Sequence, residues 1–112
     1  MRLRTAILQL CAVVAMAAIA PMALGQTTKP AGAAIVIKNF DFSPMTVTVP
    51  VGGQVTWTNK DGEIHTVVGL DGSFRSGGLD QDDSFTFRFT KPGTYAYVCS
   101  VHPRMKGQII VR

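Results

Sequence analysis

The feature that most constrains the fold of this chain is a set of four potential metal ligands. Three of them lie close together near the end of the chain, and the fourth lies far from them in the sequence. Cys99, His102 and Met105 are spaced three residues apart, and His65 lies well before them. His65 and His102 are the only two histidines. Two imidazoles, one thiolate and a weak axial thioether are the ligand set of a blue-copper electron-transfer site. A fold that uses all four must bring residue 65 to the loop of residues 99–105.

Short runs of hydrophobic and β-branched residues predict β-strands between residues 33 and 112. Alternation with period two marks four of these runs, and Val and Ile are frequent in the other two; together they cover residues 33–38, 45–49, 55–58, 85–89, 95–99 and 107–111. Glycine, proline, asparagine and aspartate separate the runs. No helical periodicity follows Gly25. The pattern predicts a β-sandwich or a small barrel, with Trp57 and the Phe85, Phe87, Phe89 stripe in its core.

The predicted strands give His65 a route to the other ligands. A β-sandwich gathers its loops at its two ends, so residues at strand ends can meet although they are far apart in sequence. Pro103 restricts the backbone directly after His102, which suits a site that should barely move when its metal changes oxidation state. Zinc is the competing metal. Structural zinc sites prefer closed sets of Cys and His, so Met105 favours copper.

The first residues have the layout of an export signal. Arg2 and Arg4 precede an apolar stretch over residues 5–24, and small residues end it. We therefore expect a signal peptide over residues 1–25, a flexible leader over 26–32 and one domain over 33–112. An uncleaved membrane anchor is the alternative, because the apolar stretch is long for a signal core. With cleavage, the protein would be exported to a bacterial periplasm without stable membrane association.

Cleavage would change both the charge and the cysteine content. The chain has 11 basic and 7 acidic residues, and removal of two arginines lowers the net charge from +4 to +2. No basic run remains, which argues against a nucleic-acid partner. Cys11 would leave with the signal, so Cys99 would be the lone thiol of an exported domain. A lone thiol in an oxidising compartment is a liability unless it is bound to something, and a metal ion could bind it.

The ordered motifs of residues 33–112 resemble the cupredoxins, the small blue-copper proteins of the plastocyanin and azurin group. The segments that carry the resemblance are residues 40–44, 52–59, 65–67 and 92–99, followed by the ligand loop. The short Cys-x-x-His-x-x-Met loop is most similar to that of amicyanin. The resemblance implies an all-β Greek-key sandwich of about eight strands, with the copper site at one end.

The resemblance also implies roles for individual residues. His65, Cys99 and His102 would be the in-plane copper ligands, and Met105 the axial one. Asn59 and Thr66 match positions near the thiolate, where hydrogen bonds tune the reduction potential. His102 would reach the surface as the electron port, within an apolar rim formed by Pro103, Met45 and Pro44.

Two positions depart from the amicyanin pattern. Val101 stands where many amicyanins have proline, and Arg104 stands where an apolar residue is common. A cation beside the port should favour an acidic or differently shaped partner. These departures weaken any transfer of amicyanin's partner, an amine dehydrogenase.

We therefore expect a monomeric electron carrier with one type 1 copper ion, rather than an enzyme. Its partners would be transient redox proteins such as a cytochrome c, an oxidoreductase or a dehydrogenase. Three alternatives remain at this point. They are a copper carrier or store that uses the same ligands, a metal-free structural sandwich, and a hydrolase with Cys99 as its nucleophile.

Overall fold

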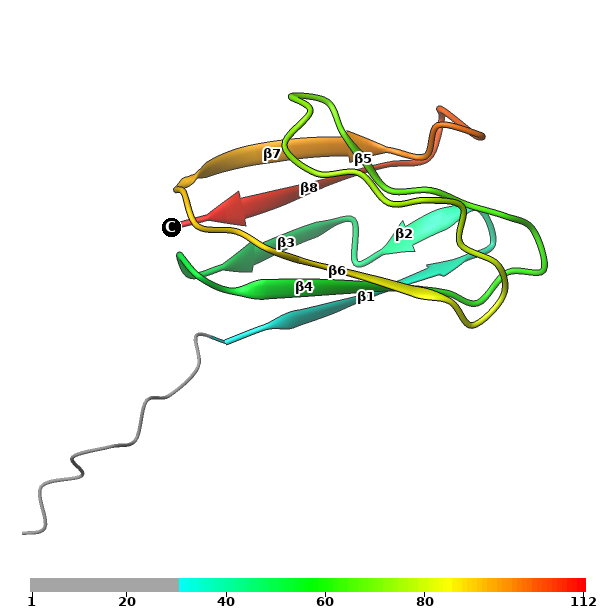
Figure 1. Ribbon diagram of the computed structural model, residues 1–112, viewed down its shortest axis with the longest axis horizontal. Coiled ribbons are helices and arrows are strands. Elements are labelled where there is room, and N and C mark those ends of the chain that lie inside the picture. Colours follow the sequence, from blue (N-terminus) through cyan, green and yellow to red (C-terminus); the bar gives the residue numbers. More distant parts are fainter. Residues whose placement is uncertain (1–30) are drawn as a thin grey trace, which may run out of the picture.

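The computed structural model describes residues 31–112, which form two four-stranded β-sheets packed face to face (Figure 1). The strands are β1 (Ala33–Lys38), β2 (Asp41–Ser43), β3 (Thr46–Val49), β4 (Gln54–Asn59), β5 (Val68–Gly69), β6 (Ser84–Arg88), β7 (Gly93–Val98) and β8 (Lys106–Val111). The predicted all-β sandwich with eight strands is confirmed. The predicted signal peptide lies outside the described residues, as does the leader up to residue 30. Within residues 31–112, no helix could span a membrane.

The strand order explains how distant parts of the chain become neighbours. One sheet has the order β2-β1-β4-β6 and the other β3-β8-β7-β5. Each sheet contains one parallel pair, β1 with β4 and β3 with β8, so the chain must cross between the sheets instead of forming only hairpins. The loops β1–β2, β4–β5 and β7–β8 all lie at one end of the sandwich (Figure 1).

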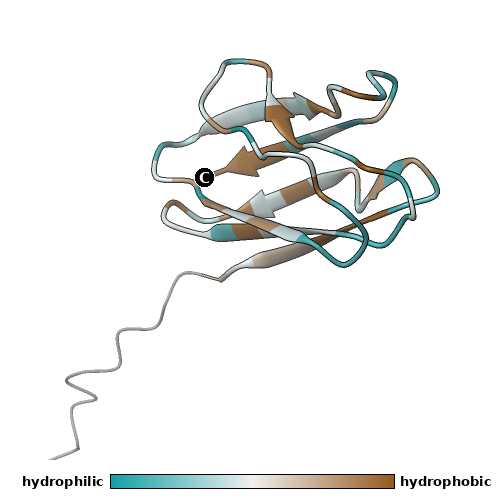
Figure 2. Ribbon diagram, turned by 45° about the vertical axis from the view of Figure 1, so that its right-hand side comes forward, coloured by the Kyte–Doolittle hydropathy of each residue, from teal (hydrophilic) through white to brown (hydrophobic). Residues whose placement is uncertain are grey.

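The core lies between the sheets, where alternate residues of each strand point inward. Hydrophobic residues lie mainly on the strands, and most hydrophilic residues lie in the loops (Figure 2). Trp57 and Phe89 are buried as predicted. Phe85 and Phe87 are only partly buried because β6 is an edge strand, although both pack against the core. Buried aromatic rings therefore form much of the contact between the sheets.

Candidate metal centre

The loop between β7 and β8 presents three of the four predicted ligands. Cys99 follows the last residue of β7 directly, and Met105 precedes the first residue of β8. The Cys99 N–H donates to the Met105 carbonyl oxygen at 3.1 Å, and the Met105 N–H donates to the His102 carbonyl oxygen at 2.9 Å. These two hydrogen bonds close the loop on itself. The backbone therefore holds the thiolate, imidazole and thioether at one end of the sandwich.

His65 reaches the same end from the connection between β4 and β5. Its backbone forms an antiparallel bridge with Leu79, with N···O distances of 3.2 and 2.8 Å. The imidazole is fully buried, and its Nε2 lies 2.8 Å from an Asp61 carboxylate oxygen. Because the carboxylate accepts, this nitrogen carries the proton. The other nitrogen, Nδ1, faces Cys99 and keeps its lone pair.

The three donor atoms surround a common point. The Cys99 Sγ lies 3.8 Å from the His65 Nδ1 and 3.9 Å from the His102 Nδ1, and the ligand atoms of the group all lie within 4.8 Å of one another. A trigonal ion with protein bond lengths of about 2.0 Å to nitrogen and about 2.3 Å to sulfur would separate sulfur from nitrogen by about 3.7 Å. The two sulfur–nitrogen distances therefore fit a bound metal ion, and the mixture of soft thiolate and imidazole suits copper.

Met105 is buried on the same loop, with 2% of its surface exposed. Its backbone bonds to Cys99 and His102 fix its backbone beside both candidate ligands. Its role as the axial ligand stays a prediction.

Hydrogen bonds to the sulfur come from Thr66. Its N–H lies 3.4 Å from the Cys99 Sγ, and its Oγ1 accepts the Ser100 N–H at 2.8 Å. Thr66 therefore lies where it was expected. The expectation for Asn59 is wrong. The Asn59 amide donates to the carbonyl oxygens of Glu63 and Leu79 and accepts the Asp61 N–H, so it braces the loop before His65 and has no donor left for the sulfur.

These surroundings favour the ionised form of Cys99. Burial raises the pKa of the thiol, but hydrogen bonds from the Thr66 and His102 N–H groups, together with the two imidazoles beside the sulfur, outweigh burial and lower the pKa to about 6. A thiolate at neutral pH is the form that binds a metal.

We expect the thiolate absorbance of the metal-free protein to rise with a midpoint near pH 6, compared with about 8.5 for a free cysteine. Because the pKa is lowered by folding, the free energy of unfolding should decrease as the pH falls through this midpoint. An ultraviolet titration measures the thiolate, and Cys99→Ser corrects for any signal from Cys11. A midpoint near that of free cysteine would contradict the described hydrogen bonding.

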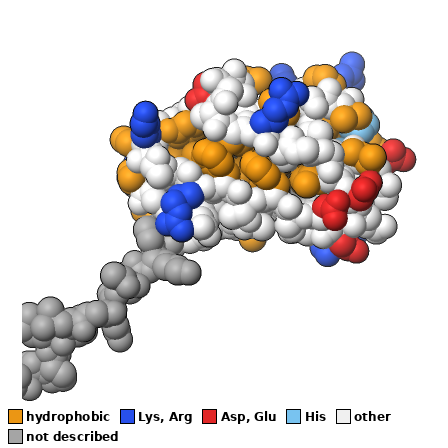
Figure 3. Space-filling model, viewed as in Figure 1, with side chains coloured by type: hydrophobic (Ala, Val, Ile, Leu, Met, Phe, Trp, Pro, Cys, Tyr) orange, Lys and Arg blue, Asp and Glu red, His pale blue; other side chains and the backbone are white. Residues whose placement is uncertain are grey.

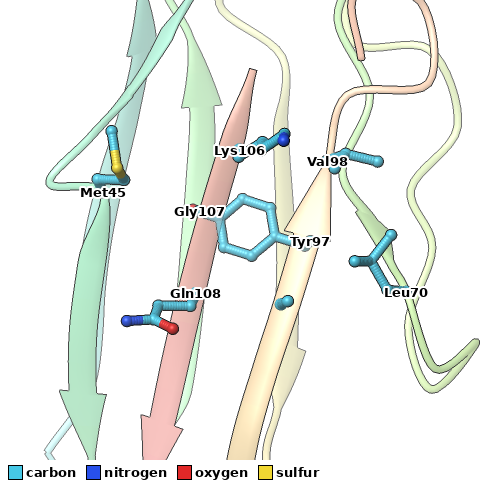
Figure 4. A pocket seen from close by; sticks show the side chains of 8 residues that line it. Met45, Leu70, Tyr97, Val98, Lys106, Gly107 and Gln108 are labelled. Carbon is cyan, nitrogen blue, oxygen red and sulfur yellow. The ribbon is translucent and has the colours of Figure 1, made fainter. Parts of the chain in front are cut away.

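The surface beside His102 is hollowed and largely apolar. A hollow of about 500 Å³ is lined by Phe40, Asp41, Val101, His102, Pro103, Arg104 and Met105. Histidine surface lies beside hydrophobic side chains at this end of the molecule (Figure 3). Pro103 therefore lines the hollow as expected, but Met45 does not. Met45 precedes β3 and lines a separate hollow with Leu70 and Gln108 on the sheet β3-β8-β7-β5 (Figure 4). Pro44 is exposed and lines neither of these two hollows.

Two residues of the site were not predicted from the sequence. Asp61 bonds to His65, and the Phe40 ring lies 5.2 Å from the His65 ring and 5.0 Å from the His102 ring, edge-on to both. The only sequence signal for Asp61 is its place four residues before a candidate ligand in a polar loop. Phe40 lies in a different loop, and its only sequence signal is its place in the motif of residues 40–44.

Comparison with known proteins agrees with this geometry. Residues 8–111 match the family described as Cupredoxin-like domain. Amicyanin-alpha of Methylorubrum extorquens is 36% identical over 93 residues, which are 73% of this chain and 74% of that protein. The structure of a purple cupredoxin from Nitrosopumilus maritimus superposes with a TM-score of 0.66 and 33% identity, covering 71% of this chain and 99% of that chain.

A larger protein also contains the same fold. The copper-containing nitrite reductase of Thermus scotoductus superposes with a TM-score of 0.68 and 31% identity over 72% of this chain. The match covers only 22% of the reductase chain, so it concerns one part of that enzyme. The chain described here belongs to the cupredoxin-like family, is similar to amicyanin, and has in His65, Cys99 and His102 a group that could hold the family's copper ion.

Proposed function

We propose that this protein is a periplasmic blue-copper electron carrier, with His65, Cys99 and His102 as in-plane ligands and Met105 as the axial ligand. The observation that carries the proposal is the convergence of two imidazole Nδ1 atoms on one thiolate within 4.8 Å. A bound copper ion would supply the one-electron Cu(I)/Cu(II) couple. The protein would hold the donors in nearly the same positions in both states, because the loop and the His65 bridge fix them through backbone hydrogen bonds.

The accessible side of the site agrees with this role. His65 and Cys99 are buried, whereas His102 is partly exposed and lines the hollow. Electrons would therefore pass through the His102 edge to a protein docked on the apolar surface. Arg104 and Asp41 line the same hollow, so its rim carries both charge signs. Transient redox partners such as a cytochrome c, an oxidoreductase or a dehydrogenase would use a small interface of this kind.

The location and domain limits belong to the same proposal. Amicyanin relatives and the export-signal pattern of residues 1–25 support a periplasmic protein whose working domain is residues 33–112. A lone cysteine with a metal ligand role suits that oxidising compartment.

Repeated redox cycling separates an electron carrier from a copper carrier. We expect the copper-loaded protein to be reduced by ascorbate and oxidised by cytochrome c on a millisecond scale, with its copper retained over many cycles. Stopped-flow absorbance measures the rates, and a Cu(I) chelator in the solution reports released metal. Transfer of copper to the chelator at each reduction would instead support a carrier or store, and failure to bind Cu(II) would refute the blue-copper site.

A further inference from the structure

The Asp61 carboxylate joins two loops that are separate in sequence. Its Oδ1 accepts the Asn39 N–H at 2.7 Å, and its Oδ2 accepts the Phe40 N–H at 3.0 Å. Oδ2 also accepts the His65 Nε2–H at 2.8 Å. The side chain is only 12% exposed. One carboxylate therefore satisfies three N–H donors, two from the β1–β2 turn and one from a candidate ligand.

The turn that Asp61 holds has an unfavourable sequence. Lys38 pairs with Asp41, so Asn39 and Phe40 form a two-residue hairpin loop, and their φ angles are 54° and 58°. Loops with positive φ at both positions favour Asn followed by Gly. Asn39 satisfies this preference, but a bulky residue such as Phe40 is rare in the left-handed region. Such a conformation persists when its surroundings hold it, and here both backbone N–H groups bind the same carboxylate.

The consequence of the turn is the position of the Phe40 ring. The ring lies edge-on to both imidazoles, with interplanar angles of 88° to His65 and 87° to His102. Its side chain remains about half exposed, so it covers the two imidazoles from the solvent side. The two imidazole centroids are themselves 5.0 Å apart. Phe40 therefore restrains His102, which has no hydrogen bond to Asp61.

We propose that Asp61 is a positioning residue for both imidazoles of the site, acting on His65 directly and on His102 through the Asn39–Phe40 turn. This inference rests on the ligand assignment under the proposed function. Ligating histidines commonly donate their second N–H to a carboxylate, which orients the ring. The additional element in this chain is that the same carboxylate fixes an aromatic ring against the second histidine.

The test uses the full chain and three single variants. Asp61→Asn keeps the shape but can accept at only one atom, so at least one donor loses its partner. Phe40→Gly removes the ring and relieves the positive φ. Asp71→Asn is the matched control, because the Asp71 carboxylate also accepts a backbone N–H, from Ser73, in an exposed turn that contains none of the site residues.

In the metal-free protein, we expect Asp61→Asn to shift the NMR resonances of the His102 ring although the two side chains share no hydrogen bond. Phe40→Gly should shift the same resonances, and the double variant should shift them by less than the sum, because both changes act through one ring. Asp71→Asn should leave them unchanged. Additive shifts, or an Asp61→Asn spectrum like that of Asp71→Asn, would overturn the proposal. If Asp61→Asn does not fold, unchanged His102 resonances in Phe40→Gly still overturn it.

Copper binding gives an independent measurement. We expect Asp61→Asn to lower the Cu(II) affinity by about 10–100-fold in chelator competition, as removal of such partners does elsewhere. If the Cu(I) affinity is unchanged, a tenfold loss raises the reduction potential by about 59 mV. A Cu(II) affinity and potential equal to those of Asp71→Asn would contradict the direct action on His65. Wild-type protein that binds no copper would refute the proposed function, whereas the NMR result would still test the coupling.

Discussion

Replacement of Cys99 by serine should abolish the intense colour of the copper-loaded protein. The colour of a blue-copper site arises from charge transfer between thiolate and copper, and Cys99 is the only cysteine among residues 31–112. We expect the Cu(II) affinity to fall by more than about 100-fold, because loss of an outer hydrogen-bond partner alone costs 10–100-fold. Visible absorbance after addition of Cu(II) measures the colour, and chelator competition measures the affinity.

The matched variant is Met105→Leu, which changes the other proposed sulfur ligand at nearly constant volume. It should keep both the copper and the colour, because the axial ligand tunes the reduction potential more than it holds the metal. Voltammetry should therefore show a shifted potential. Retained colour in Cys99→Ser would refute the ligand assignment, and an unchanged potential in Met105→Leu would show that Met105 is not axial.

Substitution of Gly107 by alanine should destabilise the domain strongly without touching a ligand. The Tyr97 ring extends from β7 across Gly107 on β8, and an added Cβ would overlap the end of that ring (Figure 4). Tyr97 is fully buried and packs edge-on against Phe42 and Trp57, so it has little room to move. Overpacking of this kind costs about 1–3 kcal/mol. For a domain of this size, each kcal/mol lowers the Tm by about 4–8 °C.

Gly77→Ala provides the control for this substitution. Apart from the adjacent residues, no heavy atom lies within 4 Å of a Cβ added at Gly77, so the free energy of unfolding of Gly77→Ala should differ from wild type by less than about 0.5 kcal/mol. Thermal unfolding of the metal-free proteins, followed by circular dichroism, compares the two variants without stabilisation by bound metal. A Tyr97→Leu background should reduce the effect at Gly107, because the smaller side chain leaves space. Equal stability of Gly107→Ala and wild type would contradict the packing described.

Local patterns predicted the strands that have several alternating residues. The alternation over residues 55–58 and 95–99 reflects strands with one buried face, and β4 and β7 lie there. β2 and β5 were not predicted because they contain only three and two residues. Such short strands exist because neighbouring strands pair with them. Two or three residues are too few to show an alternation of hydrophobic and polar residues in the sequence.

Residue chemistry and spacing by themselves determined the four ligand candidates and the metal that suits them. Cys99, His102 and Met105 lie on one loop, so their proximity follows from the length of the chain between them. Only the tertiary structure decided that Asp61 binds His65, that Asn59 braces a loop instead of the sulfur, and that Phe40 lies against both histidines. The first two contacts lie in the connection from the end of β4 to β5, and the third joins the β1–β2 turn to the β7–β8 loop of the other sheet. Their geometry depends on the path of that connection and on how the two sheets pack, and sequence spacing carries no information about either.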